Sequence, residues 1–367
     1  MSASADRAEL VDLVRGLALV GICCVNVPEM AASPGDLTPS GSLVDRVADG
    51  ALLGLLVGKS FPLFAFLLGW GIGRRWERET AAVFARRHAR RLLALAALGL
   101  AHGILVYTGD ILLPYALISL LLWPLLLLPT AGRLALGALA IPLSMATHFL
   151  LGAFILHVGS YHEPSGLAGT FAEATRQRWR DLPDAWSAVA LFNLPLAGGA
   201  ALAGAAAARA GWPRRFLEDV PWFRPVALAL AGLALLASLA AGGFLAAAGF
   251  ETAATPWLFL LMTACAAPQC LGYLLLAHRL HARGWRPAWL LAAGRNSLTC
   301  YVTQGILACW VSGSYGLGLF DRLGSAALLA LSLGIALVAT ASAVAWERLI
   351  GRGPLELLLA RLTGCRA

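Results

Sequence analysis

Residues 12–29 read DLVRGLALVGICCVNVPE, an apolar run with an arginine near its start and an asparagine and a glutamate near its end. With its flanks the run is long enough for a bilayer span, which takes about 20 apolar residues. Ionisable groups placed centrally in a span cost roughly 2.5 to 3.5 kcal/mol on insertion scales. Arg15, Asn26 and Glu29 are therefore candidate functional residues, although Arg15 and Glu29 also fit the two interfaces of a helix that only anchors.

The composition predicts an all-α polytopic integral membrane protein. The chain has 367 residues, of which 59% are hydrophobic and 13% charged, a balance that does not suit a soluble domain around one core. Apolar runs of membrane-spanning length recur along the whole chain. We expect about ten transmembrane helices, at roughly 16–32, 51–73, 92–108, 111–130, 134–157, 186–208, 225–249, 256–278, 297–313 and 325–345.

The arginines set the orientation of these spans. They collect in alternate joints, above all in Arg74–Arg91 and Arg279–Arg295, as the positive-inside rule requires. Both termini are therefore expected to be cytoplasmic. The formal charge of +8 indicates lipid headgroups rather than nucleic acid, because the arginines lie in separate short loops. Arg90 and Arg91 also suit a phosphate-bearing cofactor, since the guanidinium fork matches phosphate oxygens.

Several polar groups fall inside or at the ends of different predicted spans. A single lysine, Lys59, lies about 12 Å into its span at helical rise, where it needs a carboxylate partner such as Glu29 or Asp110. Snorkelling to the outer headgroups is the alternative for this lysine. We expect one polar cavity to collect the following residues: Asn26, Glu29, Lys59, His102, Asp110, Tyr115, Tyr301 and Gln304.

A second site is expected on the cytoplasmic side. Arg15 lies in the first turns of one span, and Arg295 precedes another, whose free backbone N–H groups favour an anion. A phosphate-bearing cofactor entering from the cytoplasm would meet both arginines. Helix capping by Asn296 or Ser297 explains the same stretch without any ligand.

Three further stretches carry weaker signals. The joint at about 159–185 is either a lid or a short amphipathic helix on the membrane surface. The tail at 352–364, RGPLELLLARLTG, is too short to span and fits a helix on the cytoplasmic surface. Neither a CxxC motif nor a Cys/His cluster is present, so no metal is expected.

Five sequence blocks together resemble the YeiB-like family of bacterial membrane proteins, and the resemblance runs over nearly the whole chain. Residues 216–367 resemble the part of that family catalogued as a domain of unknown function, and residues 1–215 are distantly similar to transmembrane acyltransferases of the heparan-glucosaminide acetyltransferase type. The resemblance implies a multi-pass protein of the bacterial cytoplasmic membrane. The blocks are DLVRGLALVGICCVN (12–26), GKSFPLFAFLLGWG (58–71), RRLLALAALGLAHGILVYTGDILLPYAL (90–117), GRNSLTCYVTQGIL (294–307) and GLGLF (316–320).

The resemblance to acyltransferases implies transfer of an acyl group from cytosolic acyl-CoA, as a co-substrate rather than a permanently bound cofactor, to a small-molecule or glycan acceptor. Two usual catalytic histidines are missing. Asn26 stands where surface-sugar acyltransferases have a histidine, and no histidine precedes the Phe61–Phe64 block. His102, Glu29 or Asp110 would then have to take the proton from the acceptor.

Transport of a small polar solute is the alternative function, because buried polar groups also line substrate and proton paths. No internal duplication supports it. In either case the expected partners are the lipid bilayer and a small-molecule substrate. A homo-oligomer is compatible with the sequence, but nothing in it predicts one.

Overall fold

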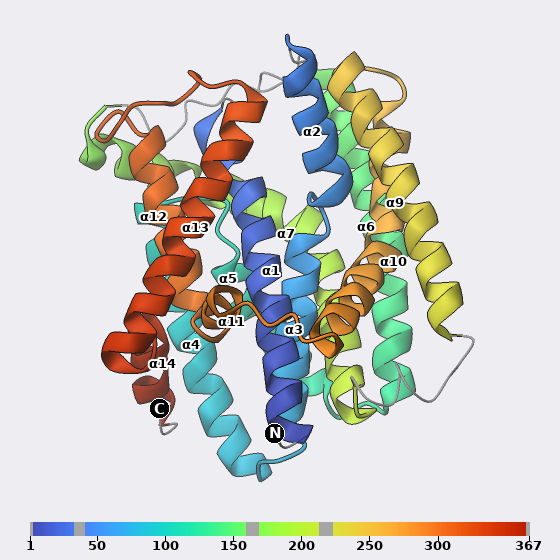
Figure 1. Cartoon of the computed structure of the whole chain (residues 1–367), viewed down its shortest axis with the longest axis vertical. Helices are drawn as coiled ribbons and strands as arrows, with labels where there is room; N and C mark the ends of the chain where they lie inside the picture. Colours follow the sequence, from blue (N-terminus) through green and yellow to red (C-terminus); the bar gives the residue numbers. More distant parts are fainter. Residues whose placement is uncertain (1–2, 33–40, 159–168, 213–222, 365–367) are drawn as a thin grey trace.

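A computed structural model of the chain describes residues 3–32, 41–158, 169–212 and 223–364. Within these ranges the chain is helical and contains no strand. Most helices run along the long axis of the molecule, and both termini lie at the same end of it (Figure 1). The helices are α1 (Ala3–Ala31), α2 (Leu43–Leu55), α3 (Ser60–Trp76), α4 (Ala81–Leu105), α5 (Leu112–Leu125), α6 (Thr130–Val158), α7 (Phe171–Arg209), α9 (Phe223–Ala248), α10 (Thr255–Ala282), α11 (Ala288–Arg295), α12 (Ser297–Ser312), α13 (Ser325–Ile350) and α14 (Pro354–Thr363).

All ten predicted spans correspond to helices, and the all-α membrane architecture is confirmed. Among the described residues, seven stretches are long and apolar enough to cross a membrane: α1, α2 with α3, α6, α7, α9, α10 and α13. The remaining three predicted spans are α4, α5 and α12. Arginines at the start of α4 lower its mean hydropathy, and α5 and α12 have only 14 and 16 residues, which at 1.5 Å per residue is short of a hydrocarbon core of about 30 Å.

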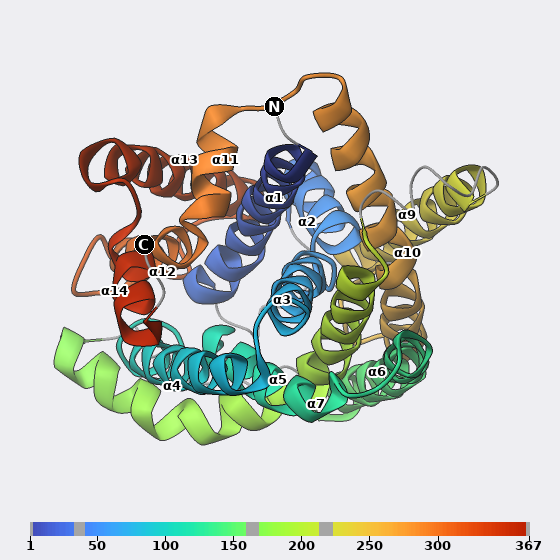
Figure 2. The same cartoon turned by 90° about the horizontal axis from the view of Figure 1, so that it is seen from below.

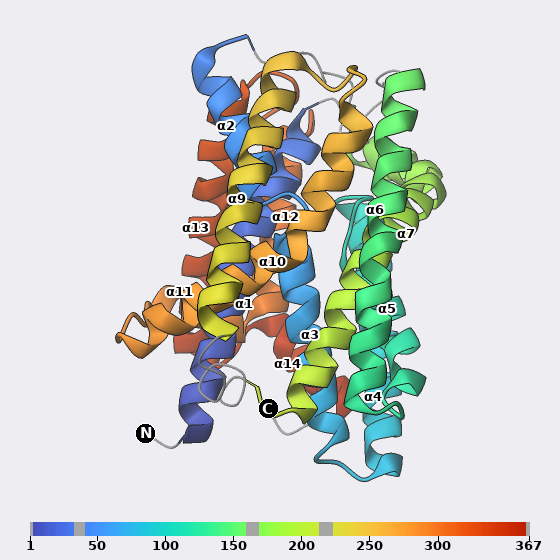
Figure 3. The same cartoon turned by 90° about the vertical axis from the view of Figure 1, so that its right-hand side faces the viewer.

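The first helix forms the centre of the bundle. In its most apolar stretch 67% of the residues are buried, the highest share among the seven. It packs against α3, α11, α12 and α13, and the view from below shows it between α11, α12 and α13 on one side and α2 and α3 on the other (Figure 2). A small residue allows one of these contacts, because a Cβ at Gly16 would collide with the carbonyl oxygen of Leu290 in α11. The arginine-rich end of α3 lies at the same end of the molecule as the two termini (Figures 1 and 3).

The predicted span at 51–73 is not one helix. It breaks at residues 56–59 into α2 and α3, and Gly58 adopts a left-handed φ of +74° there, a conformation open to glycine at little cost. The break leaves carbonyl groups at the end of α2 without helical partners. Side chains of α10 supply two of the missing donors: Gln269 donates to Gly54 O at 3.1 Å and Tyr273 to Leu55 O at 2.8 Å.

Helix α7 has two parts with different directions. Its first part runs across the bundle and its second part runs along it (Figures 1 and 2). At 39 residues the helix is far longer than a span needs, and the prolines Pro183 and Pro195 inside it interrupt the hydrogen-bond ladder and favour bending. A helix at the end of the 159–185 joint is therefore confirmed from Phe171, while residues 159–168 lie outside the described ranges.

The predicted helix in the tail is confirmed, since α14 covers Pro354–Thr363. The short helix α11, which no apolar run predicted, packs on α1 and α13. The two predicted domains are in contact, because α2 packs on α9 and α1 packs on α11 and α13. The division at residue 215 stays a prediction.

Candidate functional site

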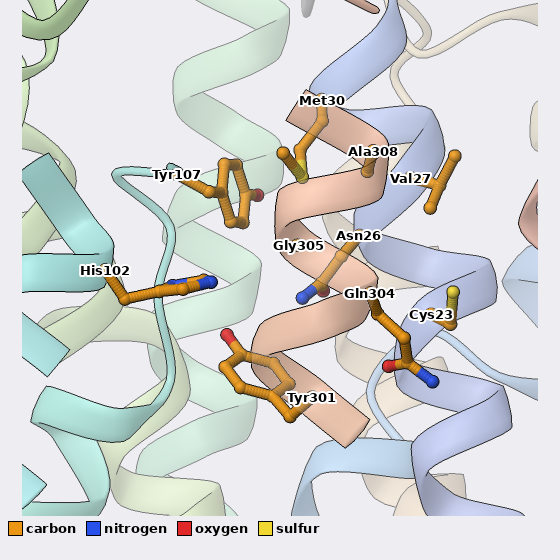
Figure 4. A pocket seen from close by; sticks show the side chains of 10 residues that line it. All are labelled: Cys23, Asn26, Val27, Met30, His102, Tyr107, Tyr301, Gln304, Gly305 and Ala308. Atoms are coloured by element: carbon orange, nitrogen blue, oxygen red, sulfur yellow. The ribbon is translucent and has the colours of Figure 1, made fainter. Parts of the chain in front are cut away.

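A narrow pocket lies between α1, α12 and the end of α4, and it collects much of the predicted polar site (Figure 4). The room inside it is about that of a single water molecule. In Figure 4 the ring of Tyr301 presents its hydroxyl toward His102, and Asn26 of α1 faces His102 across the pocket. The lining residues are Cys23, Asn26, Val27, Met30, His102, Tyr107, Tyr301, Gln304, Gly305 and Ala308.

Asp110 is the hub of the site although it does not line the pocket. Its Oδ2 accepts hydrogen bonds from the backbone N–H groups of Leu112 at 2.9 Å and Leu113 at 3.1 Å, so that it caps the start of α5. Its Oδ1 accepts a hydrogen bond from the hydroxyl of Tyr301 at 3.0 Å. The Tyr301 hydroxyl in turn accepts a bond from the N–H of Ile111 at 3.3 Å. Asp110 is only 2% exposed, and its orientation is fixed from both sides.

His102 lies beside this carboxylate in the last turn of α4. Its Nδ1 is 3.0 Å from Asp110 Oδ1, although the alignment of the two groups falls outside hydrogen-bond geometry, and its Nε2 has no partner. The ring is 5% exposed. A proton on Nδ1, facing the carboxylate, leaves the lone pair of Nε2 for the pocket. A general base needs such a free ring nitrogen, and a neighbouring carboxylate is the kind of group that can orient its ring.

Gly305 makes room for this imidazole. A Cβ at position 305 would lie 2.5 Å from His102 Nε2 and 3.0 Å from its Cε1, closer than side-chain atoms pack. The glycine of the TQGIL segment in α12 is thus required by the histidine of α4. Sequence spacing could not reveal this, because more than two hundred residues separate the two positions.

Glu29 lies at the rim of the pocket. Its Oε2 accepts a hydrogen bond of 2.6 Å from the hydroxyl of Tyr107, a pocket residue, and the side chain of Glu29 is exposed. Asn26, one helical turn earlier on α1, lines the pocket itself. Of the predicted catalytic residues, His102 and Asp110 are therefore in contact. Glu29 is linked to the pocket by its hydrogen bond with Tyr107.

Gln304 and Tyr115 have different surroundings. Gln304 is 3% exposed, lines the pocket and has no partner for its Oε1, so that a ligand group could donate to it. Tyr115 is buried but does not line the pocket: its hydroxyl donates to Phe61 O at 2.8 Å and its ring stacks on Phe64. The structure thus assigns Tyr115 contacts with α3 rather than with the pocket.

Lys59 does not have the carboxylate partner that we expected. It is fully buried at the break between α2 and α3, and its Nζ donates to Leu53 O at 3.1 Å. Its own carbonyl accepts a bond from Cys270 of α10. The free carbonyls of the α2 end attract a cation through the helix dipole, which explains why this partner replaces Glu29 and Asp110. Snorkelling is also wrong for Lys59, because the side chain is enclosed by protein.

Arg178 in the crossing part of α7 was not singled out from the sequence as part of the site. It is 3% exposed. Its guanidinium donates from Nε to Ile104 O at 2.9 Å and from one terminal nitrogen to the hydroxyl of Tyr315 at 3.3 Å. Ile104 follows His102 by two residues, so Arg178 holds the turn of α4 that carries the imidazole. In the sequence Arg178 is one of several arginines in a predicted loop, and nothing distinguishes it from them. Its role follows only from its contacts with Ile104 and Tyr315 in the structure.

The predicted cytoplasmic anion site is filled by the protein's own carboxylates. Arg295 pairs in a bidentate manner with Glu347 of α13, at 2.5 and 2.9 Å, and this hydrogen bonding raises the pKa of the Arg295 guanidinium above its usual value. Arg15 lies 3.5 Å from Asp12 on the same helix. The structure therefore does not bring Arg15 and Arg295 together as a free pair of cations.

The free N–H groups at the start of α12 are also bound by a carboxylate of the protein. Glu356 of α14 accepts hydrogen bonds from the N–H groups of Leu298 and Thr299. Asn296 is the N-cap residue but makes no side-chain capping bond, and its Oδ1 instead accepts from Gly353 N at 2.6 Å. The prediction that Asn296 or Ser297 caps this helix is wrong, because the tail helix supplies the carboxylate.

Arg90 and Arg91, the other predicted phosphate ligands, lie on α4 at the arginine-rich end. Arg90 is exposed, and a Cβ at Gly364 after α14 would lie 3.6 Å from its guanidinium. Arg91 is partly buried and interacts with other groups of the protein. Neither lines the pocket, so the pocket and these arginines are separate features.

The seven apolar spans and the buried polar pocket define the chain as an all-α polytopic membrane protein. Residues 207–366 match the family described as "Protein of unknown function (DUF418)". The whole chain is 28% identical over 395 residues to "Uncharacterized protein YeiB" of Escherichia coli (strain K12), with 98% of this chain and 96% of that protein covered. The identity to "Uncharacterized protein YxaH" of Bacillus subtilis (strain 168) is 25% over 395 residues, with 96% and 93% covered. The chain is thus similar to these two proteins over nearly its entire length, and no solved structure matches it.

Proposed function

We propose that the protein is a membrane acyltransferase that moves an acyl group from acyl-CoA to a hydroxyl or amine of a small-molecule or glycan acceptor. One observation carries the proposal. The imidazole of His102 lies next to the buried carboxylate of Asp110, and its Nε2 has no hydrogen-bond partner at the pocket. In this role His102 Nε2 takes the proton of the acceptor, and Asp110 orients the ring and stabilises the imidazolium. Asn26, Tyr301 and Gln304 line the same pocket and would position the acceptor.

The reaction balances without any further reactant. The acceptor oxygen or nitrogen attacks the thioester carbonyl carbon, the C–S bond breaks, and the CoA thiolate receives the proton that His102 took from the acceptor. The products are the acylated acceptor and free CoA. Because the pocket holds about one water, it suits the reacting group alone, and the rest of the acceptor would extend past Glu29 at the rim.

The distance between the pocket and the cytoplasmic side fits a donor with a long arm. Along α12, Gln304 lies eight residues after Asn296, which is about 12 Å at helical rise. Acyl-CoA bound at the arginine-rich end would have to cover this distance with its pantetheine arm. We place the protein in the cytoplasmic membrane of its cell, with the arginine-rich end toward the cytoplasm.

The test combines binding and turnover in the purified protein. Saturable thermal stabilisation by acetyl-CoA or longer acyl-CoAs, and not by an equal concentration of ATP, supports a specific donor site. Loss of acyl-CoA consumption in His102→Ala with retained donor binding supports the role of the base. His157→Ala is the matched control, because His157 is exposed at the end of α6.

Solute transport is the second candidate, and the break between α2 and α3 favours it. Discontinuous membrane helices present half-helix ends to substrates and ions in many transporters, and here Lys59 lies at the end of α2 like a bound cation. A folded protein that no acyl-CoA stabilises would favour transport over acyl transfer.

A further inference from the structure

An open apolar groove lies on the surface between the ends of α3 and α5, away from the polar pocket. It is lined by Trp76, Trp123, Pro124 and Leu127. Leu127 is 74% exposed, and in a membrane protein such a surface faces lipid. Trp76 ends α3 directly after Arg74 and Arg75, so the groove lies at the arginine-rich end of the bundle.

Aromatic packing makes the wall of this groove rigid. Phe84 of α4 contacts Trp76 edge to face at 5.1 Å and stacks on His88 at 4.9 Å. His88 contacts Trp123 at 5.3 Å, is 1% exposed, and its Nε2 lies 3.0 Å from Ser119 O. The two tryptophans are therefore held from behind and present fixed surfaces to whatever lies in the groove.

Positive charge lies near the groove. Arg75 and Arg91 are close enough to act electrostatically on His88, which packs on Trp123. A third cation, Arg133, is fully buried beside the end of α5, where it donates to Leu126 O and Leu128 O. Residues 74–91 contain seven arginines and two glutamates.

Both glutamates of this segment already have cationic partners. Glu79 pairs with Arg87 at 3.1 Å, and Glu77 lies 3.9 Å from Arg209. With seven arginines and two glutamates, the segment 74–91 has a net positive charge. An apolar groove with cations at one end matches the shape and charge of a lipid with an anionic headgroup.

We propose that this groove binds one acyl chain of an anionic phospholipid from the leaflet at the arginine-rich end, with the lipid phosphate at Arg75 and Arg91. Guanidinium forks match phosphate oxygens, and tryptophans suit the boundary between headgroups and acyl chains. A zwitterionic lipid lacks the net charge that this end of the bundle attracts. The groove is separate from the polar pocket around His102, although it lies at the same arginine-rich end as the proposed acyl-CoA donor.

The experiment uses the full chain reconstituted in vesicles of phosphatidylcholine that contain a small fraction of brominated lipid, because bromine quenches neighbouring tryptophans. We expect brominated phosphatidylglycerol to quench more than the same fraction of brominated phosphatidylcholine. The excess should fall in Trp76→Phe and in Trp123→Phe. It should persist in Trp257→Phe, because Trp257 is 63% exposed in the first turn of α10, away from the groove.

Arginine variants test the headgroup contact without touching the groove. In Arg75→Gln/Arg91→Gln the excess quenching by phosphatidylglycerol should disappear, whereas Arg283→Gln, an exposed arginine after α10, should keep it. In Leu127→Ala we expect a smaller excess of quenching by phosphatidylglycerol. The core should not be disturbed, since Leu127 is exposed. Equal quenching by the two lipids in the wild type, or an excess that survives both tryptophan substitutions, would overturn the proposal.

Discussion

Glu356 in the tail helix and Thr299 in α12 are joined by two hydrogen bonds: Glu356 Oε1 accepts from the Thr299 N–H at 3.1 Å and Oε2 from the Thr299 hydroxyl at 2.5 Å. The same carboxylate accepts from Leu298 N at 2.7 Å. It thus occupies the N-terminal end of the helix that carries Tyr301 and Gln304. The tail of the chain is a structural cap for the helix of the candidate site.

Substitution of this carboxylate should loosen the tail. Glu356→Gln removes the charge that favours the helix N-terminus, and we expect a loss of about 1 to 3 kcal/mol in the docking of α14. Faster trypsin cleavage at Arg361, which is exposed, would report it. Leu358→Ala on the same helix, at a residue 42% exposed, should cleave at the wild-type rate. Equal rates in all three proteins would contradict the capping role.

The buried carboxylate at position 110 should be important for stability as well as for the proposed chemistry. Both oxygens of Asp110 accept hydrogen bonds, one from the N–H groups of α5 and the other from the hydroxyl of Tyr301. In Asp110→Asn only one oxygen remains as an acceptor, and the NH2 group faces a donor on the other side. We expect a loss of about 1 to 3 kcal/mol, measured as a lower melting temperature in detergent. Asp184→Asn, at an exposed position in α7, should leave the melting temperature unchanged.

The contact between Gly305 and His102 predicts a non-additive pair of substitutions. Gly305→Ala places a methyl group against the imidazole and should lower the melting temperature. In the background of His102→Ala that cost should largely vanish, because the clashing ring is gone. Gly334→Ala in α13, where an added methyl group meets nothing within 4 Å, is the control. Additive effects of the first two substitutions would show that the two residues do not touch.

Arg178 should keep the crossing part of α7 on the site. Arg178→Gln removes donors from Ile104 O and Tyr315, so we expect α7 to detach more often and to expose Cys309, which lies 3.9 Å from the guanidinium. The measurement is the rate of alkylation of Cys309 by N-ethylmaleimide, followed by mass spectrometry. Arg180→Gln changes an exposed arginine of the same helix and should react at the wild-type rate. A rate for Arg178→Gln no faster than this control would exclude the role.

The sequence by itself determined the membrane class, the approximate positions of ten helices and the residue types of the site. These follow from local properties, because the length and apolarity of a run decide whether it enters a bilayer, whatever its neighbours are. The placement of His102, Asp110 and Tyr301 near one cavity was also expected, from the positions of His102 and Tyr301 in two spans and of Asp110 in the turn between two spans.

The tertiary structure alone decided which polar group meets which. Lys59 bonds to a helix-end carbonyl instead of an acid, Arg295 pairs with Glu347, and Glu356 takes the helix end expected for a ligand. Each partner lies on another helix or beyond a helix break. Helix depth is encoded in the run of hydropathy, but rotation and neighbour choice depend on the packing of small residues such as Gly16 and Gly305 against distant backbone and side chains. For that reason the candidate polar residues could be read from the chain, and their pairing could not.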